Sequence, residues 1–234
     1  MKKYTFIAVA LFSTFLICGA TYFNKPSQTD STYISSNNVE WVDLNLPSGT
    51  LWCSCNIGAT SPEICRDYFA WGEIKSKDSY SWDNYIHSNN NEQLTKYNTL
   101  VSRPESINLE PIDDVAHAIW GEDVHIPTET DWYELVYNTT NFWTTINGVH
   151  GYLITSQNGN SIFLPAAGEY IGNNLYFVNE FGHYWSSSLL AGDEAVACKF
   201  VSSAIAISSG SRYLGFPIRA VREKSVNESN MQNQ

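Results

Sequence analysis

The chain has 234 residues and a formal net charge of −11, and 43% of its residues are hydrophobic. This length suits one domain with a sizeable core. An acidic surface repels phosphate backbones and anionic lipid headgroups, so the composition argues against nucleic-acid binding and against a basic membrane-binding patch.

Residues 1–20 have the pattern of a secretory signal peptide. A Met-Lys-Lys start is followed by residues 4–20, which carry no charge, and the small residues Cys18 and Ala20 suit cleavage after Ala20. The apolar segment is short for a membrane-spanning helix, which needs about 20 residues, so an uncleaved anchor is the second interpretation. The sequence therefore predicts an exported protein, located in the cell envelope, in the periplasm or at the cell surface.

Lipidation at Cys18 is a third interpretation of this leader. Gly19 after the cysteine fits a lipoprotein signal, whereas Ile17 before it does not. Contact with the membrane is thus expected only through the N-terminal segment, when that segment is uncleaved or lipidated.

The rest of the chain divides into a tether, one domain and a tail. Residues 21–38 are rich in Ser, Thr and Asn and have no apolar periodicity, which predicts a tether. Residues 223–234 are interpreted as a disordered tail. The domain between them spans residues 39–222.

A β-hairpin is predicted at the start of the domain. Residues 39–46 mostly alternate between apolar and polar side chains, a Pro-Ser-Gly turn follows at residues 47–49, and residues 50–56 continue as the second strand. Residues 84–110 are polar and weakly patterned, so a long irregular excursion is expected there.

Two helices are predicted in the middle of the domain. The first spans residues 112–120, with Asp113 and Asp114 in its first turn, where acidic residues stabilise the helix dipole. The second follows Thr128, which is a suitable N-cap, and Asp131 three residues later completes a capping box.

The remainder is predicted to be β. Residues 152–156 and 161–164 flank an Asn-Gly pair, which is typical of a hairpin turn. Pro217 lies in the last strand candidate and indicates an edge or a bulge. The other strand candidates are residues 184–188, 196–201, 204–208 and 215–222. Strands, then two helices, then strands indicate an α+β fold.

Four cysteines follow the leader, and export would permit disulfides. They are Cys53, Cys55, Cys65 and Cys198. Cys53 and Cys55 share one face of a strand and are poorly placed to bond each other, whereas a turn brings Cys65 within reach of Cys53. A Cys53–Cys65 disulfide and four buried free thiols are expectations of equal weight.

Several short sequence motifs follow one another along the chain and together cover nearly all of residues 40–222. They are VDLNLPSGTLW at 42–52, CNIGA at 55–59, DYFAWGE at 67–73, LTKYN at 94–98, WG at 120–121, IPT at 126–128, NGNSIFLPAAG at 158–168, YWSSS at 184–188 and a closing match over 215–222. Together they resemble the Fibrobacter succinogenes major paralogous domain family. The resemblance implies an exported bacterial protein with a C-type-lectin-like domain, in which two helices pack on antiparallel sheets with many loops.

The sequence departs from this family at three places. Val124 and His125 stand where the family usually has Trp-Arg, Pro217 stands where a small polar residue is usual, and Cys53 and Cys65 are additions to the family pattern. These departures affect local details of the expected domain and not its fold.

Catalytic activity is not expected from the sequence. The motifs of phosphate-binding loops, zinc proteases and serine hydrolases are absent. Formylglycine-generating enzymes, which share the implied fold, use two cysteines near the C-terminus, and here only Cys198 lies in that half. The histidines lack metal-ligand spacing; they are His87, His117, His125, His150 and His183. No cofactor is predicted, although acidic pairs leave a structural calcium ion as an option.

The resemblance places the recognition surface in C-terminal strands and loops, here residues 189–214. The candidate ligand-binding residues are Leu189, Leu190, Asp193, Glu194, Arg212 and Tyr213. Most of the tryptophans are expected in the core, whereas Tyr170, Tyr176 and Tyr213 lie in polar stretches and are expected at the surface.

The leading functional hypothesis is a cell-envelope binding module for a protein or glycan ligand, because recognition usually sits on loops of a rigid scaffold. The alternatives are an enzyme with divergent chemistry on this scaffold and a structural subunit of a surface assembly, since a fold alone does not fix a function.

Overall fold

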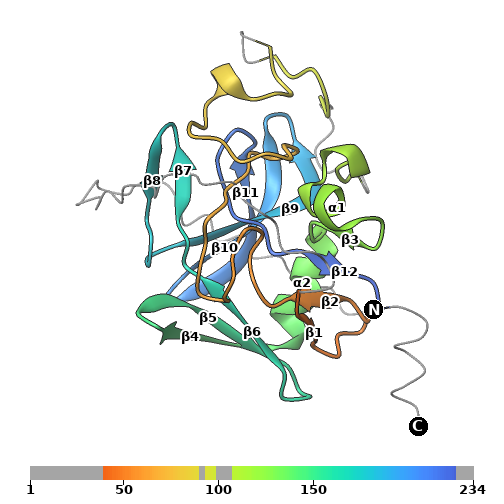
Figure 1. Ribbon diagram of the computed structural model, residues 1–234, viewed down its shortest axis with the longest axis vertical. Coiled ribbons are helices and arrows are strands. Elements are labelled where there is room, and N and C mark those ends of the chain that lie inside the picture. Colours follow the sequence, from red (N-terminus) through yellow and green to blue (C-terminus); the bar gives the residue numbers. More distant parts are fainter. Residues whose placement is uncertain (1–38, 90–92, 99–106, 225–234) are drawn as a thin grey trace, which may run out of the picture.

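The computed structural model describes residues 39–89, 93–98 and 107–224 (Figure 1). The predicted signal peptide with Cys18, the tether and most of the predicted tail lie outside the described residues. Within the described ranges, no helix is long and apolar enough to cross a membrane.

A four-stranded sheet joins the two ends of the domain. Its strands are β1 (Trp41–Asp43), β2 (Leu51–Cys53), β12 (Val221–Arg222) and β3 (Val124–His125), in that order. β1 and β2 form the predicted hairpin, although each strand is shorter than the sequence pattern, and β12 pairs antiparallel with both β2 and β3. The start and the end of the domain are therefore held together by backbone hydrogen bonds.

The first helix begins later than predicted. Residues Pro111–Asp113 form a short 3-10 helix, η3, and the α-helix α1 spans Val115–Trp120. Asp114 is the N-cap of α1, and its carboxylate accepts the backbone N–H groups of Ala116 and His117. A cap has non-helical backbone angles, so Asp114 separates the two helical segments.

The second helix confirms its predicted cap. α2 spans Glu129–Asn138, and the Thr128 side chain accepts the Asp131 backbone N–H while the Asp131 carboxylate accepts the Thr128 N–H. Trp132 and Leu135 are buried and form the expected apolar face.

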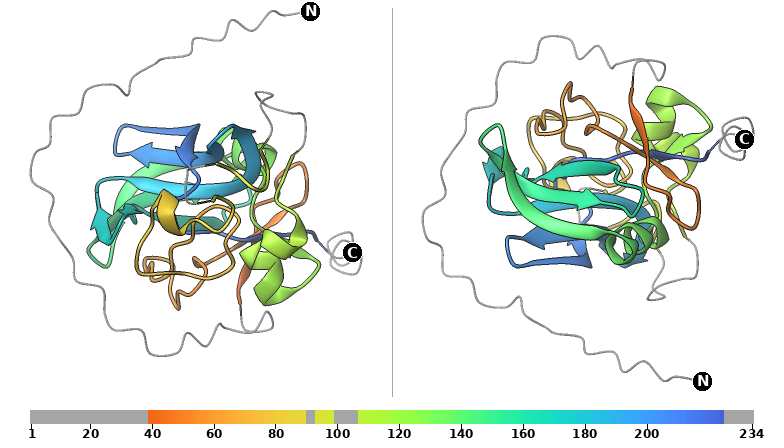
Figure 2. Two further views of the ribbon diagram at one scale, coloured as in Figure 1. Left: turned by 90° about the horizontal axis from the view of Figure 1, so that it is seen from above. Right: turned by 90° about the horizontal axis from the view of Figure 1, so that it is seen from below.

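A three-stranded sheet follows α2 directly. It consists of β4 (Thr140–Ile146), β5 (Val149–Thr155) and β6 (Ser161–Pro165). The predicted hairpin between β5 and β6 is confirmed, whereas β4 was missed. Seen from below in Figure 2, this sheet lies in front of the rest of the molecule.

The C-terminal half contains a second three-stranded sheet and a small hairpin. The sheet has the order β11 (Ala204–Ser211), β10 (Glu194–Val201), β9 (Gly182–Ala191), and the hairpin consists of β7 (Glu169–Ile171) and β8 (Asn174–Tyr176). The strand predicted at residues 215–222 is wrong over most of its length. Gly215 and Phe216 make only isolated bridges, and Pro217 has no N–H group with which to continue a ladder.

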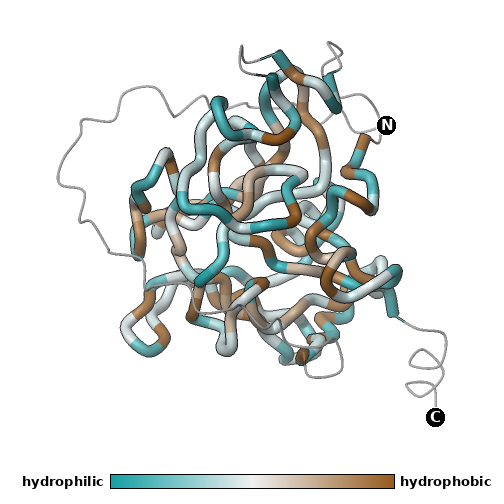
Figure 3. The backbone as a smooth tube through the Cα atoms, turned by 45° about the horizontal axis from the view of Figure 1, so that its top comes forward, coloured by the Kyte–Doolittle hydropathy of each residue, from teal (hydrophilic) through white to brown (hydrophobic). Residues whose placement is uncertain are grey.

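These elements make the predicted α+β arrangement of mostly antiparallel sheets, two α-helices and many loops in the described chain. Hydrophobic and hydrophilic residues alternate over short distances along the tube in Figure 3, as expected where strands bury one face. Three clusters of buried side chains fill the interior. The first is centred on Phe69, Trp71, Trp185 and Phe216, the second on Trp52, Trp132, Leu164 and Phe200, and the third on Tyr68, Tyr80, Tyr85 and Tyr170.

The predicted surface position of Tyr170 is wrong. Tyr170 is buried in the third cluster, and its ring packs edge-on against Tyr68 with the ring centroids 4.8 Å apart. The hydrogen bonds between Tyr80 and Gly172 join the loop before η2 (Trp82–Asn84) to the β7–β8 hairpin and so enclose this tyrosine.

The predicted Cys53–Cys65 disulfide is also corrected, because all four described cysteines are free thiols. Cys53 packs in the first cluster, whereas Cys65 packs against the third. Burial raises the pKa of Cys53 to about 11 and that of Cys65 to about 12. Both thiols therefore stay protonated and unreactive at neutral pH.

A fully buried arginine connects three segments of the fold. The Arg219 guanidinium donates to the Asn56 side-chain oxygen at 2.9 Å and to the backbone carbonyls of Cys53 at 3.1 Å, Ser54, and Phe163 at 2.8 Å. The acceptors of these hydrogen bonds are all uncharged oxygens, so the cation is solvated by the protein itself.

Candidate functional site

Four of the six predicted ligand-binding residues meet at one end of the β9–β10–β11 sheet. The backbone N–H of residue 212 donates to the Asp193 carbonyl at 3.0 Å, and Glu194 pairs with Ser211 across β10 and β11. This joins the turn after β9 to the segment after β11. Leu190, Asp193, Glu194 and Tyr213 thus lie at the same end of the sheet, where Asp193 is exposed and the other three are half-buried.

Trp82 lies against Tyr213 at this end of the sheet and was missed by sequence reasoning. Its ring packs against Tyr213 with the centroids 5.0 Å apart and edge-on against Tyr85 at 5.6 Å. Trp82 is half-buried in η2, far from the C-terminal strands in sequence. A tryptophan in an otherwise polar stretch was the available signal. Leu190, Asp193, Glu194, Tyr213 and Trp82 are hereafter called the β9–β11 tip.

The other two predicted ligand-binding residues are corrected, because both are buried. Leu189 packs in the first core cluster, and its backbone N–H donates to the Ile107 carbonyl at 2.8 Å. Successive side chains of a strand point to opposite faces, so Leu189 points inward where Leu190 does not. Arg212 is 0% exposed.

Arg212 fastens a loop to the core instead of meeting a ligand. Its guanidinium donates to the carbonyls of Lys96 at 3.2 Å and Tyr97 at 2.5 Å, and it lies over the Trp71 ring at 5.0 Å. Burial lowers the pKa of Arg212, while Tyr85 acts in the opposite direction. The segment 93–98 is thereby attached beneath the β9–β11 tip.

A second set of contacts attaches the same segment to the region before α1. Lys96 Nζ lies 2.5 Å from the Asp113 carboxylate and 2.6 Å from that of Glu110, and the Tyr97 hydroxyl donates to Asp113 at 2.5 Å. His87 Nε2 is 3.8 Å from the other oxygen of Asp113. Asp113 was predicted to stabilise a helix dipole; it instead holds a loop in place.

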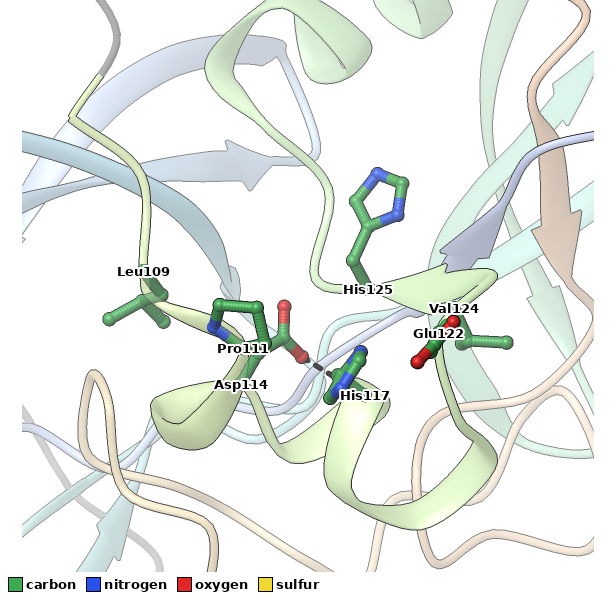
Figure 4. Close-up of a pocket in the computed structure, with 7 residues that line it drawn as sticks. All are labelled: Leu109, Pro111, Asp114, His117, Glu122, Val124 and His125. Carbon is green, nitrogen blue, oxygen red and sulfur yellow. Dashed lines mark hydrogen bonds between the residues drawn. The ribbon is translucent and has the colours of Figure 1, made fainter.

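An open pocket of about 470 Å³ lies beside α1 and β3 (Figure 4). It is lined by Leu109, Pro111, Asp114, His117, Glu122, Val124 and His125. Both carboxylate oxygens of Asp114 already accept backbone N–H groups, two of them in α1 and the third at Ile126. The His125 ring points away from the Asp114 and Glu122 side chains in Figure 4.

Within residues 39–89, 93–98 and 107–224, no group of three or more His, Cys, Asp or Glu side chains is arranged to hold a metal ion.

One histidine forms a buried pair with an acid. His183 Nδ1 lies 3.0 Å from Glu169 Oε2, and both side chains are about 10% exposed. Lys199 lies nearby, with its ammonium group over the Phe216 ring at 5.3 Å, and burial lowers the pKa of this lysine. The pair thus satisfies two polar groups inside the sheet region and is a structural contact.

His183 and His125 are expected to give opposite pH dependences of stability. Burial lowers the pKa of His183 against the opposing effect of Glu169. The contribution of neutral His183 to the free energy of unfolding is therefore complete above its unfolded-state pKa, near 6.5, and is lost as the pH falls through its lowered folded-state pKa. Burial also acts to lower the pKa of His125, but Asp131, 3.9 Å away, and Asp114 raise it overall. The contribution of protonated His125 to the free energy of unfolding is complete below its unfolded-state pKa and is lost as the pH rises through its raised folded-state pKa.

Urea unfolding from about pH 5 to pH 8 measures both effects. His183→Gln is expected to reduce the loss of unfolding free energy on the acid side, and His125→Gln to reduce the loss on the alkaline side. The two variants act as controls for each other. The same change in the slope of unfolding free energy against pH in both variants would contradict opposite roles for His183 and His125.

The chain matches no family model, no curated protein and no solved structure.

Proposed function

We propose that this chain is a cell-envelope binding module that recognises a glycan or protein ligand at the β9–β11 tip. The observation that carries the proposal is the half-buried Trp82–Tyr213 aromatic pair at the end of the sheet where the backbone of residue 212 bonds to Asp193. The residues of the β9–β11 tip come from two loops and a strand end, which is the usual arrangement of a recognition surface.

The chemistry of the β9–β11 tip favours a glycan. A half-buried aromatic ring offers a flat apolar face with a polar edge, which suits the C–H face of a sugar ring. The carboxylates of Asp193 and Glu194 accept hydrogen bonds from hydroxyl groups, and charged acceptors make the stronger hydrogen bonds. Glu194 is already oriented by the Ser209 hydroxyl, which donates to it at 3.1 Å.

The proposal includes export and a C-type-lectin-like scaffold. The signal-peptide pattern of residues 1–20 supports export. The antiparallel sheets, the two α-helices and the pairing of β2 with β12 agree with such a scaffold and with the Fibrobacter succinogenes major paralogous resemblance. The enzyme alternative would use the pocket of Figure 4, where the Asp114 carboxylate already accepts three backbone N–H groups.

Binding can be tested with a glycan array and a panel of envelope proteins, followed by affinity measurement on a hit. Trp82→Ala and Tyr213→Ala are each expected to weaken binding by about tenfold or more, since buried aromatic contacts dominate such surfaces. Repeating the measurement with EDTA shows whether a calcium ion takes part.

Tyr137→Ala is the matched control for Tyr213→Ala. Tyr137 is 76% exposed on α2 and stacks on Tyr133, outside the β9–β11 tip, so its removal is expected to leave affinity unchanged. Unchanged affinity in Trp82→Ala and Tyr213→Ala would place the site elsewhere.

A further inference from the structure

β4 is an edge strand with an unusual composition. It spans seven residues, pairs only with β5 in the described chain, and has the sequence TNFWTTI without a charged residue or a proline. Natural edge strands are commonly protected by charge, proline, a bulge or shortness, and β4 has none of these. Its register with β5 is continuous, without a bulge.

The hairpin register shows which backbone groups of β4 face outward. Asn147 and Gly148 form a two-residue turn with positive φ at both positions, so Ile146 and Val149 are a hydrogen-bonded pair. Hydrogen-bonded pairs alternate along an antiparallel ladder. The backbone N–H and C=O groups of Asn141, Trp143 and Thr145 therefore point away from β5.

We infer that β4 pairs antiparallel with β4 of a second copy of this chain, with Trp143 opposite Trp143 of the second copy. The three outward-facing residues are spaced evenly about Trp143, so a two-fold axis there pairs Asn141 of each copy with Thr145 of the other. Every outward N–H then meets an outward C=O, which makes the edge self-complementary as a two-fold interface requires.

Charge does not oppose a second copy at this edge, although it does elsewhere on the molecule. The chain carries a net charge of −11, which opposes the approach of two copies at most of their surface. β4 contributes no charge, so two β4 edges meet without like charges opposite each other. Phe142, which is 65% exposed in the single chain, lies beside Thr144 of the second copy and becomes partly buried, which is favourable for an apolar side chain.

The pairing leaves the β9–β11 tip uncovered. In Figure 1 β4 lies at the lower left and the turn between β9 and β10 lies in the upper part of the molecule. A pair of chains thus presents two tips, and two linked binding sites raise the apparent affinity for a repetitive ligand. The pairing itself does not depend on the proposed function.

Disulfide trapping tests the pairing and its register. In the proposed register residue 142 faces residue 144 of the second copy as a non-hydrogen-bonded pair, with Cα atoms about 4.5 Å apart. A Phe142→Cys/Thr144→Cys variant is expected to form a cross-linked dimer under mild oxidation. A Phe142→Cys/Ile146→Cys variant has no partner cysteine opposite either position and is the matched control, because Cα atoms more than about 7 Å apart do not form a disulfide.

Analytical ultracentrifugation of the purified chain tests the backbone bonds. Thr145→Pro removes an outward N–H from each copy, which an edge strand tolerates, and is expected to weaken dimerisation roughly tenfold. Thr145→Val keeps the N–H and is expected to dimerise like the unaltered chain. A chain that stays monomeric up to about 1 mM, or equal cross-linking in both double-cysteine variants, would overturn the inference.

Discussion

Replacing Arg219 with alanine is expected to lower the free energy of unfolding by about 3–5 kcal/mol. The substitution leaves the buried oxygens of Asn56, Cys53, Ser54 and Phe163 without the donor that now serves them, and each buried acceptor without a partner is costly. It also opens a cavity at a 0% exposed position. Such a loss is a large part of the 5–15 kcal/mol typical of a whole domain.

Two further variants separate charge from geometry at this position. Arg219→Lys keeps the charge, but one ammonium group does not match the four acceptors that the planar guanidinium group now serves. An intermediate loss of unfolding free energy is therefore expected. Arg66→Ala removes an exposed arginine and is expected to change stability by less than about 0.5 kcal/mol. Chemical denaturation measures all three, and a loss below about 1 kcal/mol for Arg219→Ala would refute the role assigned to this side chain.

Trp185→Ala is expected to lower the free energy of unfolding by a similar amount, about 3–5 kcal/mol. The Trp185 ring is fully buried and stacks on Phe216 with the centroids 4.2 Å apart. Its indole N–H donates to the Phe69 carbonyl at 2.7 Å, and its own carbonyl accepts the Trp132 indole N–H at 3.2 Å. Truncation removes packing from the first core cluster and leaves the Phe69 carbonyl without this donor.

Trp82→Ala is the matched control for this second variant. The same truncation at the half-buried Trp82 is expected to weaken ligand binding with a stability loss below about 1.5 kcal/mol. Thermal or urea unfolding distinguishes the two tryptophans. Equal losses for Trp185→Ala and Trp82→Ala would show that Trp82 is a core residue and would remove it from the β9–β11 tip.

Much of the fold was predictable because local signals and tertiary packing agree. The capping box at Thr128 and Asp131 defines the start of α2 from sequence alone, and the Asn-Gly pair at 158–159 marks the β5–β6 hairpin. β4 was missed although its β-branched and aromatic residues and the Asn147-Gly148 turn both indicate a strand. The overextended last strand fails at Pro217, where the chain instead bonds to separate segments through isolated bridges.

The site was less predictable because its members come from distant parts of the chain. Leu190, Asp193, Glu194 and Tyr213 could be suggested from one C-terminal interval, but which side chains of that interval face inward depends on packing. Arg212 reads as a surface cation in sequence and is buried because its guanidinium satisfies two carbonyls of segment 93–98. No local pattern places Trp82 against Tyr213, since that contact joins η2 to the segment after β11, which is far away in the chain.

Hydrogen exchange with and without the best ligand from the binding panel tests the central claim most directly. The account predicts ligand-dependent protection of residues 189–194 and 211–214 and of the segment around Trp82, with no ligand-dependent change in β4. Protection confined to other surfaces, such as the pocket beside α1, would contradict recognition at the β9–β11 tip.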